Sequence, residues 1–179
     1  MRGILFLIVG ASGVGKDTLI DLLKCRLPDF YFPRRYITRD ADKGGEDYIA
    51  VSTETFDEMV NKGEFCVHWQ AHGLQYGAHS NIKNILEDGR NVVLNTSRSV
   101  IEKFEQQFAN TVIVEVTANR EALRERLTER GRENAEDIDA RLLRKVKPIC
   151  CEILEKVDNS ADINCAFAAL VDIINRRTS

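Results

Sequence analysis

Residues 10–18 read GASGVGKDT, and this stretch decides the fold. Gly10, Gly15 and Lys16 fit the pattern G-x-x-x-x-G-K-[ST], in which backbone N–H groups surround phosphates and the final hydroxyl holds Mg²⁺. The residue in that final position is Asp17, an anion. A short apolar run precedes the stretch, and leucines at helical spacing follow it. A buried strand, a glycine-rich turn and a helix N-terminus, in this order, predict an anion site.

The loop is predicted to bind the phosphates of ATP. Lys16 is expected to reach the β- and γ-phosphates, which makes it a candidate catalytic residue. Thr18 carries a hydroxyl one residue beyond the usual position, suitably placed for the α-phosphate. The predicted ATP-binding residues are Gly10, Ala11, Ser12, Gly13, Val14, Gly15, Lys16, Asp17 and Thr18.

Asp17 admits two interpretations. A carboxylate suits the first turn of a helix, where the helix dipole favours negative charge. It can also meet Mg²⁺, directly or through water, because Mg²⁺ prefers oxygen ligands and keeps several waters. Without a metal, a carboxylate beside a triphosphate would be repelled. Both interpretations stay open, and ATP and Mg²⁺ are the predicted cofactors.

Strand and helix patterns alternate along most of the chain. Continuous apolar runs predict buried strands, and apolar residues at helical spacing predict helices. The alternation indicates an α/β fold of the P-loop NTPase type, with a mainly parallel sheet and helices on both faces. Strands are predicted over 4–9, 91–94 and 111–116, and helices over 15–26, 99–108, 120–130 and from 138 onward. Between residues 31 and 77, short β-forming segments and one helix, 56–61, predict a small, partly antiparallel insertion.

Composition excludes several classes of protein. The chain has 179 residues, the size of one domain, and its net charge of −3 gives no support to a nucleic-acid partner. Five cysteines, an odd number without a C-x-x-C pair, indicate reduced thiols in a cytoplasmic protein. The first apolar run is too short for a membrane span and lacks a signal-peptide cleavage site. The sequence is compatible with a homodimer and does not decide the oligomeric state.

The arginines point to a phosphotransferase. The predicted strand 91–94 ends at Asn95 and the strand 111–116 contains Glu115, so neither ends in the aspartate expected of a motor-type ATPase. Arginines can neutralise the charge of a phosphoryl donor and a phosphorylated acceptor instead. They gather on the insertion side and around a polar segment: Arg34, Arg35, Arg39, Arg124, Arg126, Arg130, Arg132, Arg141 and Arg144.

Across nearly its whole length the chain resembles the guanylate kinase superfamily. The matching stretches are GASGVGKDT, YITRD, EDYIAVS, FDEMVNKGEF, HGLQYG and RLTERGREN. The resemblance implies one guanylate kinase-like domain over residues 1–179, with three parts. These are a core over 1–30 and 91–179, an acceptor-binding insertion over about 31–90, and an arginine lid over about 130–140.

The resemblance also implies roles for single residues. Adenine would lie near Asn159 and Ser160. The acceptor's phosphate would be held by Arg39, Tyr48 and Tyr76, and the transferring phosphoryl group would be neutralised by the lid or lid-adjacent Arg130, Arg132 and Arg141.

Departures from the guanylate kinase pattern point to another acceptor. Guanylate kinases bind guanine with acids in the segments F-[LV]-E and L-D-x-D, but residues 65–67 read FCV and residues 94–97 read LNTS. A site that loses these polar groups loses its selectivity for guanine.

The motifs GKD-[ST], R-Y-I-T-R-D, W-x-A-x-G-L-x-Y-G, N-x-S-R and R-G-R-E-N-A resemble the ribose 1,5-bisphosphate phosphokinase family. That resemblance implies transfer of the γ-phosphoryl group of ATP to ribose 1,5-bisphosphate, giving 5-phosphoribosyl 1-diphosphate (PRPP), in phosphonate catabolism. Asn95, Ser97 and Arg98 would then bind this sugar phosphate, although Asn95 and Ser97 suit strand-end capping equally well. The alternatives are a guanylate or other nucleoside monophosphate kinase and, in another class, a non-catalytic guanylate kinase-like binding module.

Overall fold

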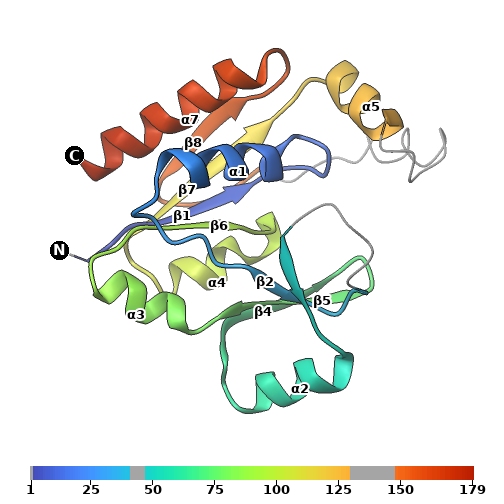
Figure 1. The fold of residues 1–179 in the computed structure, drawn as a ribbon, viewed down its shortest axis with the longest axis vertical. Coiled ribbons are helices and arrows are strands. Elements are labelled where there is room, and N and C mark those ends of the chain that lie inside the picture. The colour runs from blue at the N-terminus through green and yellow to red at the C-terminus, as the bar shows by residue number, and fades with distance from the viewer. Residues whose placement is uncertain (1, 41–46, 130–147) are drawn as a thin grey trace.

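A four-stranded parallel sheet lies at the centre of the fold (Figure 1). The computed structural model describes residues 2–40, 47–129 and 148–179. The strand order is β6-β1-β7-β8, and each neighbouring pair is parallel. The carboxyl ends of parallel strands meet at one edge, which is where open α/β sheets bind ligands. The strands are β1 (Leu5–Val9), β6 (Val92–Asn95), β7 (Thr111–Thr117) and β8 (Leu154–Asp158).

Helices cover both faces of this sheet, as Figure 1 shows. Side chains alternate along β1, so Phe6 and Ile8 enter one apolar layer while Leu7 and Val9 enter the other. Helices α1 and α7 complete the first layer, and α3, α4 and the insertion complete the second. Burying one such side chain stabilises the fold by about 1.5–3 kcal/mol. The helices of this part are α1 (Lys16–Arg26), α3 (Asn81–Glu87), the 3₁₀ turn η1 (Arg98–Val100), α4 (Ile101–Glu105), α5 (Arg120–Glu129) and α7 (Ile163–Thr178).

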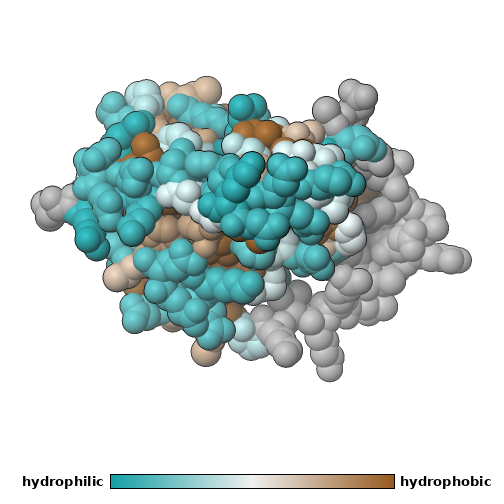
Figure 2. Space-filling model, turned by 90° about the horizontal axis from the view of Figure 1, so that it is seen from below, coloured by the Kyte–Doolittle hydropathy of each residue, from teal (hydrophilic) through white to brown (hydrophobic). Residues whose placement is uncertain are grey.

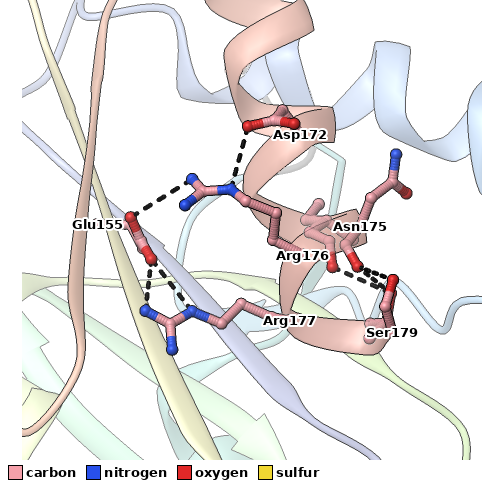
Figure 3. A network of polar contacts seen from close by, with 8 residues as sticks. Glu155, Asp172, Asn175, Arg176, Arg177 and Ser179 are labelled. Carbon is pink, nitrogen blue, oxygen red and sulfur yellow. Dashed lines mark hydrogen bonds and ion pairs between the residues drawn. The ribbon is translucent and has the colours of Figure 1, made fainter.

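Charged side chains tie the end of α7 to β8 (Figure 3). Arg177 Nε lies 3.1 Å from Glu155 Oε1, and Arg176 Nη2 lies 3.9 Å from Glu155 Oε2. Arg176 Nε also lies 3.1 Å from Asp172 Oδ2, one helical turn earlier. Exposed pairs of this kind contribute at most about 1 kcal/mol each. The network therefore sets the position of the helix end more than it stabilises the fold.

A second, smaller sheet forms the insertion, in the order β3-β2-β5-β4. β2 and β3 are parallel, whereas β2 with β5 and β4 with β5 are antiparallel. The β4–β5 hairpin turns at His72 and Gly73, whose φ values of 53° and 73° suit a two-residue hairpin loop. The elements are β2 (Arg35–Ile37), β3 (Tyr48–Ala50), α2 (Thr53–Asn61), β4 (Phe65–Ala71) and β5 (Leu74–His79).

The surface on the side that carries α2 is mainly hydrophilic, with small hydrophobic areas between polar ones (Figure 2). No helix in residues 2–40, 47–129 or 148–179 is both long and apolar enough to cross a membrane. All five cysteines are free. Burial raises the pKa of the Cys66 thiol to about 11, so this thiol stays protonated at neutral pH and is no nucleophile.

The predicted α/β fold is confirmed, and the three predicted strands match β1, β6 and β7. The predicted helix 99–108 is wrong in length, because it begins as η1 and α4 ends at Glu105. The chain turns there toward β7, and the Thr111 hydroxyl donates to the Phe108 carbonyl oxygen at 2.5 Å. The helix expected from residue 138 begins outside the described residues. Three elements were not predicted: α3, β8 and α7.

Candidate active site

The glycine-rich loop joins β1 to α1 at the carboxyl edge of the parallel sheet (Figure 1). Gly15 precedes the helix with φ 90° and ψ 20°, a left-handed conformation that residues with a Cβ rarely adopt. The first-turn N–H groups of α1, which have no acceptor within the helix itself, therefore follow directly on the turn of the loop. A helix N-terminus in this position favours anions in general, and the phosphate site at this loop stays a prediction.

Asn159 forms a hydrogen bond with the backbone of the loop. This residue directly follows β8 and is 1% exposed, and its Nδ2 donates to the carbonyl oxygen of Val14 at 2.7 Å. A Cβ on Gly15 would lie only 2.4 Å from the same Nδ2. The amide of Asn159 is thus buried against the loop backbone. Its predicted place near adenine stays a prediction. Ser160, its neighbour, receives a hydrogen bond from the backbone N–H of Asn119 at 2.8 Å.

Gly15→Ala is expected to lower the free energy of unfolding by about 2–5 kcal/mol. The left-handed backbone costs about 1–2 kcal/mol with a Cβ, and displacing the Asn159 amide adds about 1–3 kcal/mol of overpacking. Gly63→Ala is the matched control, because Gly63 has φ 68° but no atom within 4 Å of the position that its Cβ would take. Denaturant unfolding of both variants measures the difference. Equal losses would show that the contact with Asn159 carries no stability.

The side chain of Lys16 lies across the loop. Its Nζ donates to the carbonyl oxygens of Gly10 at 3.1 Å and Ala11 at 3.0 Å. The ammonium group is thus held at the loop, at the N-terminus of α1, where the predicted phosphates would bind. Ser12 and Thr18, also predicted to bind ATP, are both exposed.

Asp17, on the first turn of α1, contacts the end of β6. Asn95 Nδ2 donates to Asp17 Oδ1 at 2.6 Å, although the two residues are 78 positions apart. Both line one groove between α1 and the insertion. Further along this groove, Lys24 and Arg34 pair with Asp47 at 3.5 Å and 3.7 Å. The groove therefore lies along α1, between its first turn and the ion pairs of Asp47.

Arg98, at the start of η1, forms an ion pair with a carboxylate of β7. Its Nη2 lies 3.0 Å from Glu115 Oε1, and the two side chains are 22% and 14% exposed. Arg98 Nε is buried without a hydrogen-bond partner in the described part of the chain. Ser97 accepts a hydrogen bond from the N–H of Ser99 at 3.3 Å, which fits the capping interpretation of this residue. Glu115 is a site neighbour that sequence reasoning did not assign.

The insertion presents aromatic rings and arginines together. The guanidinium carbon of Arg39 lies 5.4 Å from the centre of the Tyr48 ring, and Arg39 Nη2 lies 3.5 Å from Tyr76 Oη. Arg35 lies over the Tyr76 ring at 5.6 Å. Trp69 stacks on the ring of Tyr76, with ring centres 5.4 Å apart. The predicted phosphate-binding residues Arg39, Tyr48 and Tyr76 are thus brought together.

Two predictions remain, namely the arginine lid and the metal. Arg130, Arg132 and Arg141, with the predicted lid, lie outside the described residues. Within the described ranges, no group of three or more His, Cys, Asp or Glu side chains could hold a metal ion. The carboxylate of Asp17 beside the loop still fits Mg²⁺ brought by a nucleotide, because such ions are held by one or two carboxylates and the substrate's phosphates.

Known proteins are similar to this chain in sequence. The model of the guanylate kinase family matches residues 2–177. The chain is 40% identical over 178 residues to the ribose 1,5-bisphosphate phosphokinase PhnN of Rhizobium etli, a match that spans 97% of this chain and 90% of that protein. It is 45% identical over 179 residues to the bifunctional ribose 1,5-bisphosphokinase-thymidine phosphorylase of Roseobacter denitrificans, covering 97% of this chain. The chain spans only 26% of the length of that bifunctional relative.

Solved structures share the fold. A guanylate kinase from Anaplasma phagocytophilum superimposes with a TM-score of 0.73 at 20% identity, over 99% of this chain and 87% of that one. A gluconokinase from Sinorhizobium meliloti superimposes with a TM-score of 0.54 at 16% identity, over 98% of this chain and 95% of that one. At these identities the likeness concerns the fold alone. The family match and the relatives together lead to the conclusion that this chain belongs to the guanylate kinase family of P-loop kinases, alongside the ribose 1,5-bisphosphate phosphokinases.

Proposed function

We propose that the protein transfers the γ-phosphoryl group of ATP to ribose 1,5-bisphosphate, giving PRPP and ADP. The observation that carries the proposal is the apolar position 67. Guanylate kinases have a guanine-binding acid there, whereas Val67 is 2% exposed and packs in the core. A guanine base would find no carboxylate at this position, while a sugar bisphosphate needs none. The relatives named above carry this activity in their names, and one of them is matched over 90% of its length.

The chemistry suits the residues of the glycine-rich loop and of the insertion. The nucleophile is an oxygen of the acceptor's phosphate, which is already ionised near neutral pH, so no general base is required. The protein's task is then to hold two phosphates in line and neutralise their charge. We assign the ATP phosphates to the P-loop with Lys16, and the acceptor's phosphate to Arg39, Tyr48 and Tyr76.

The other assignments complete the proposed site. Asp17 would hold the Mg²⁺ of the metal–nucleotide complex, whose charge would balance that of the phosphates. Asn95, Ser97 and Arg98 would bind the sugar phosphate. Arg130, Arg132 and Arg141 stay predicted to neutralise the transferring group. The division into core, insertion and lid, the homodimer and the cytoplasmic location also remain predictions, the last supported by five free cysteines.

Turnover with a set of acceptors tests the proposal. A coupled ADP-release assay compares ribose 1,5-bisphosphate, GMP, AMP and no acceptor, and ³¹P NMR identifies the product. We expect ADP release with ribose 1,5-bisphosphate well above the rate without acceptor, and a new diphosphate signal. Turnover with GMP alone would replace the proposal with a guanylate kinase. The absence of turnover with every acceptor would favour a binding module.

A further inference from the structure

Two departures from the usual P-loop arrangement contact each other. P-loop NTPases hold Mg²⁺ with a Ser or Thr after the loop lysine and with an aspartate at the end of another strand. This chain has Asp17 in the first position. At the end of β6, the strand beside β1, it has Asn95, whose partner in the register is Ile8. The carboxylate is on the helix and the neutral side chain is on the strand.

The contact sets the orientation of the Asn95 amide. A carboxylate accepts hydrogen bonds and cannot donate them, so the NH₂ group of Asn95 must face Asp17 Oδ1, 2.6 Å away. The amide oxygen then faces away from the carboxylate. Among residues 2–40, 47–129 and 148–179, this buried Oδ1 has no hydrogen-bond partner. A buried oxygen without a donor is costly, which points to a ligand that supplies a cation or an O–H group.

We infer that Asp17 and Asn95 have exchanged the two roles of a P-loop metal site: α1 supplies the carboxylate for the metal–nucleotide complex, and β6 supplies a neutral oxygen. Asn95 is a positioning residue, because its NH₂ group holds the Asp17 carboxylate in place. Its Oδ1 adds a second hard oxygen suited to Mg²⁺ or to a water bound to it. The inference rests on the proposed use of Mg²⁺ and ATP, and it assigns Asn95 to the metal site in place of the sugar phosphate, for which Ser97 and Arg98 stay proposed.

The exchange explains why each single substitution should weaken the Mg²⁺-dependent binding of the nucleotide. Aspartate at both positions would place two carboxylates within hydrogen-bonding distance, where like charges repel. A hydroxyl at position 17 with the amide at position 95 would leave the pair without a negative charge. Exchanging both residues, as Asp17→Ser with Asn95→Asp, restores one carboxylate and one neutral partner. The pair is therefore expected to behave as one unit.

Calorimetry of nucleotide binding tests this unit without turnover. The affinity for a non-hydrolysable ATP analogue is measured with Mg²⁺ and with a chelator, and their ratio gives the gain due to the metal. Asp17→Ser and Asn95→Asp are each expected to reduce that gain about 10- to 100-fold, as loss of a metal's supporting groups does. In the double variant, the gain due to the metal should recover to within about 5-fold of the wild-type value. Such a recovery would be a strong coupling in the double-mutant cycle. Asp17→Ser should also bind the metal-free analogue more tightly, because a charge that repels the triphosphate is gone.

Asp21→Ser is the matched control, since Asp21 lies one turn along α1 and lines the same groove. It is expected to change the gain less than about 2-fold. Independent, multiplying losses in the double variant, or an unchanged gain in Asp17→Ser, would overturn the inference. Circular dichroism confirms that each variant folds, and the double variant is informative even where a single one does not fold. Wild-type turnover of ribose 1,5-bisphosphate is scored separately, so the failure of the exchange and the failure of the proposed function are distinguished.

Discussion

Lys16→Ala is expected to lower kcat by about 100- to 1,000-fold, the usual effect of removing one preorganised donor from a charged transition state. The ammonium group lies within 3.1 Å of two loop carbonyl oxygens, so the fold holds it at the predicted phosphate site. Negative charge on the transferring group spreads over its oxygens during transfer, and Lys16 would stabilise that charge more than the charge of bound ATP. The coupled ADP-release assay at saturating substrates gives kcat directly.

The fold should survive this substitution. Lys16 is partly exposed, and its hydrogen bonds to Gly10 and Ala11 run to backbone carbonyls of the same loop. Lys62→Ala serves as the control, because Lys62 is 63% exposed and pairs only weakly with Glu58 at 3.5 Å. A kcat of Lys16→Ala within a factor of a few of the Lys62→Ala value would remove Lys16 from the catalytic residues.

Much of the core could be predicted because its signals are local. Residues 5–9 are all buried, and a continuous apolar run is what a strand covered on both faces requires. The glycines and lysine that follow indicate the turn and the helix start within one short stretch. The insertion was visible for the same reason, since its β-forming segments match β2, β3, β4 and β5.

The contacts that build the site could not be predicted, because they join residues far apart in the chain. Asp17 meets Asn95 only because β6 pairs with β1, and Asn159 reaches Val14 across 145 positions because β8 lies beyond β7. A single sequence indicates the strands without their order. The Arg98–Glu115 pair depends on strand order in the same way, since its members come from η1 and β7. Sequence reasoning therefore found candidate residues one at a time and missed which of them act as pairs.

Arg39→Ala is expected to raise the KM for ribose 1,5-bisphosphate about 10- to 100-fold, corresponding to about 1.5–3 kcal/mol for hydrogen bonds to a charged group. Arg39 lies against two tyrosines, with its guanidinium carbon 5.4 Å from the Tyr48 ring centre and its Nη2 3.5 Å from Tyr76 Oη. These contacts restrict the guanidinium, so it can present a planar pair of donors to a phosphate. The KM for ATP should stay within about 2-fold, because Arg39 is on the insertion and the P-loop is on the core.

Arg39→Lys separates charge from geometry at this position. A lysine keeps the positive charge but has no planar fork of donors, so it should recover only part of the acceptor affinity. Arg34→Ala is the matched control, because Arg34 is 53% exposed and lies 3.7 Å from Asp47. We expect it to change the acceptor KM less than about 3-fold. Equal increases in the KM values for ATP and for the acceptor in Arg39→Ala would contradict a phosphate-binding role, since a general disturbance of the fold affects both substrates.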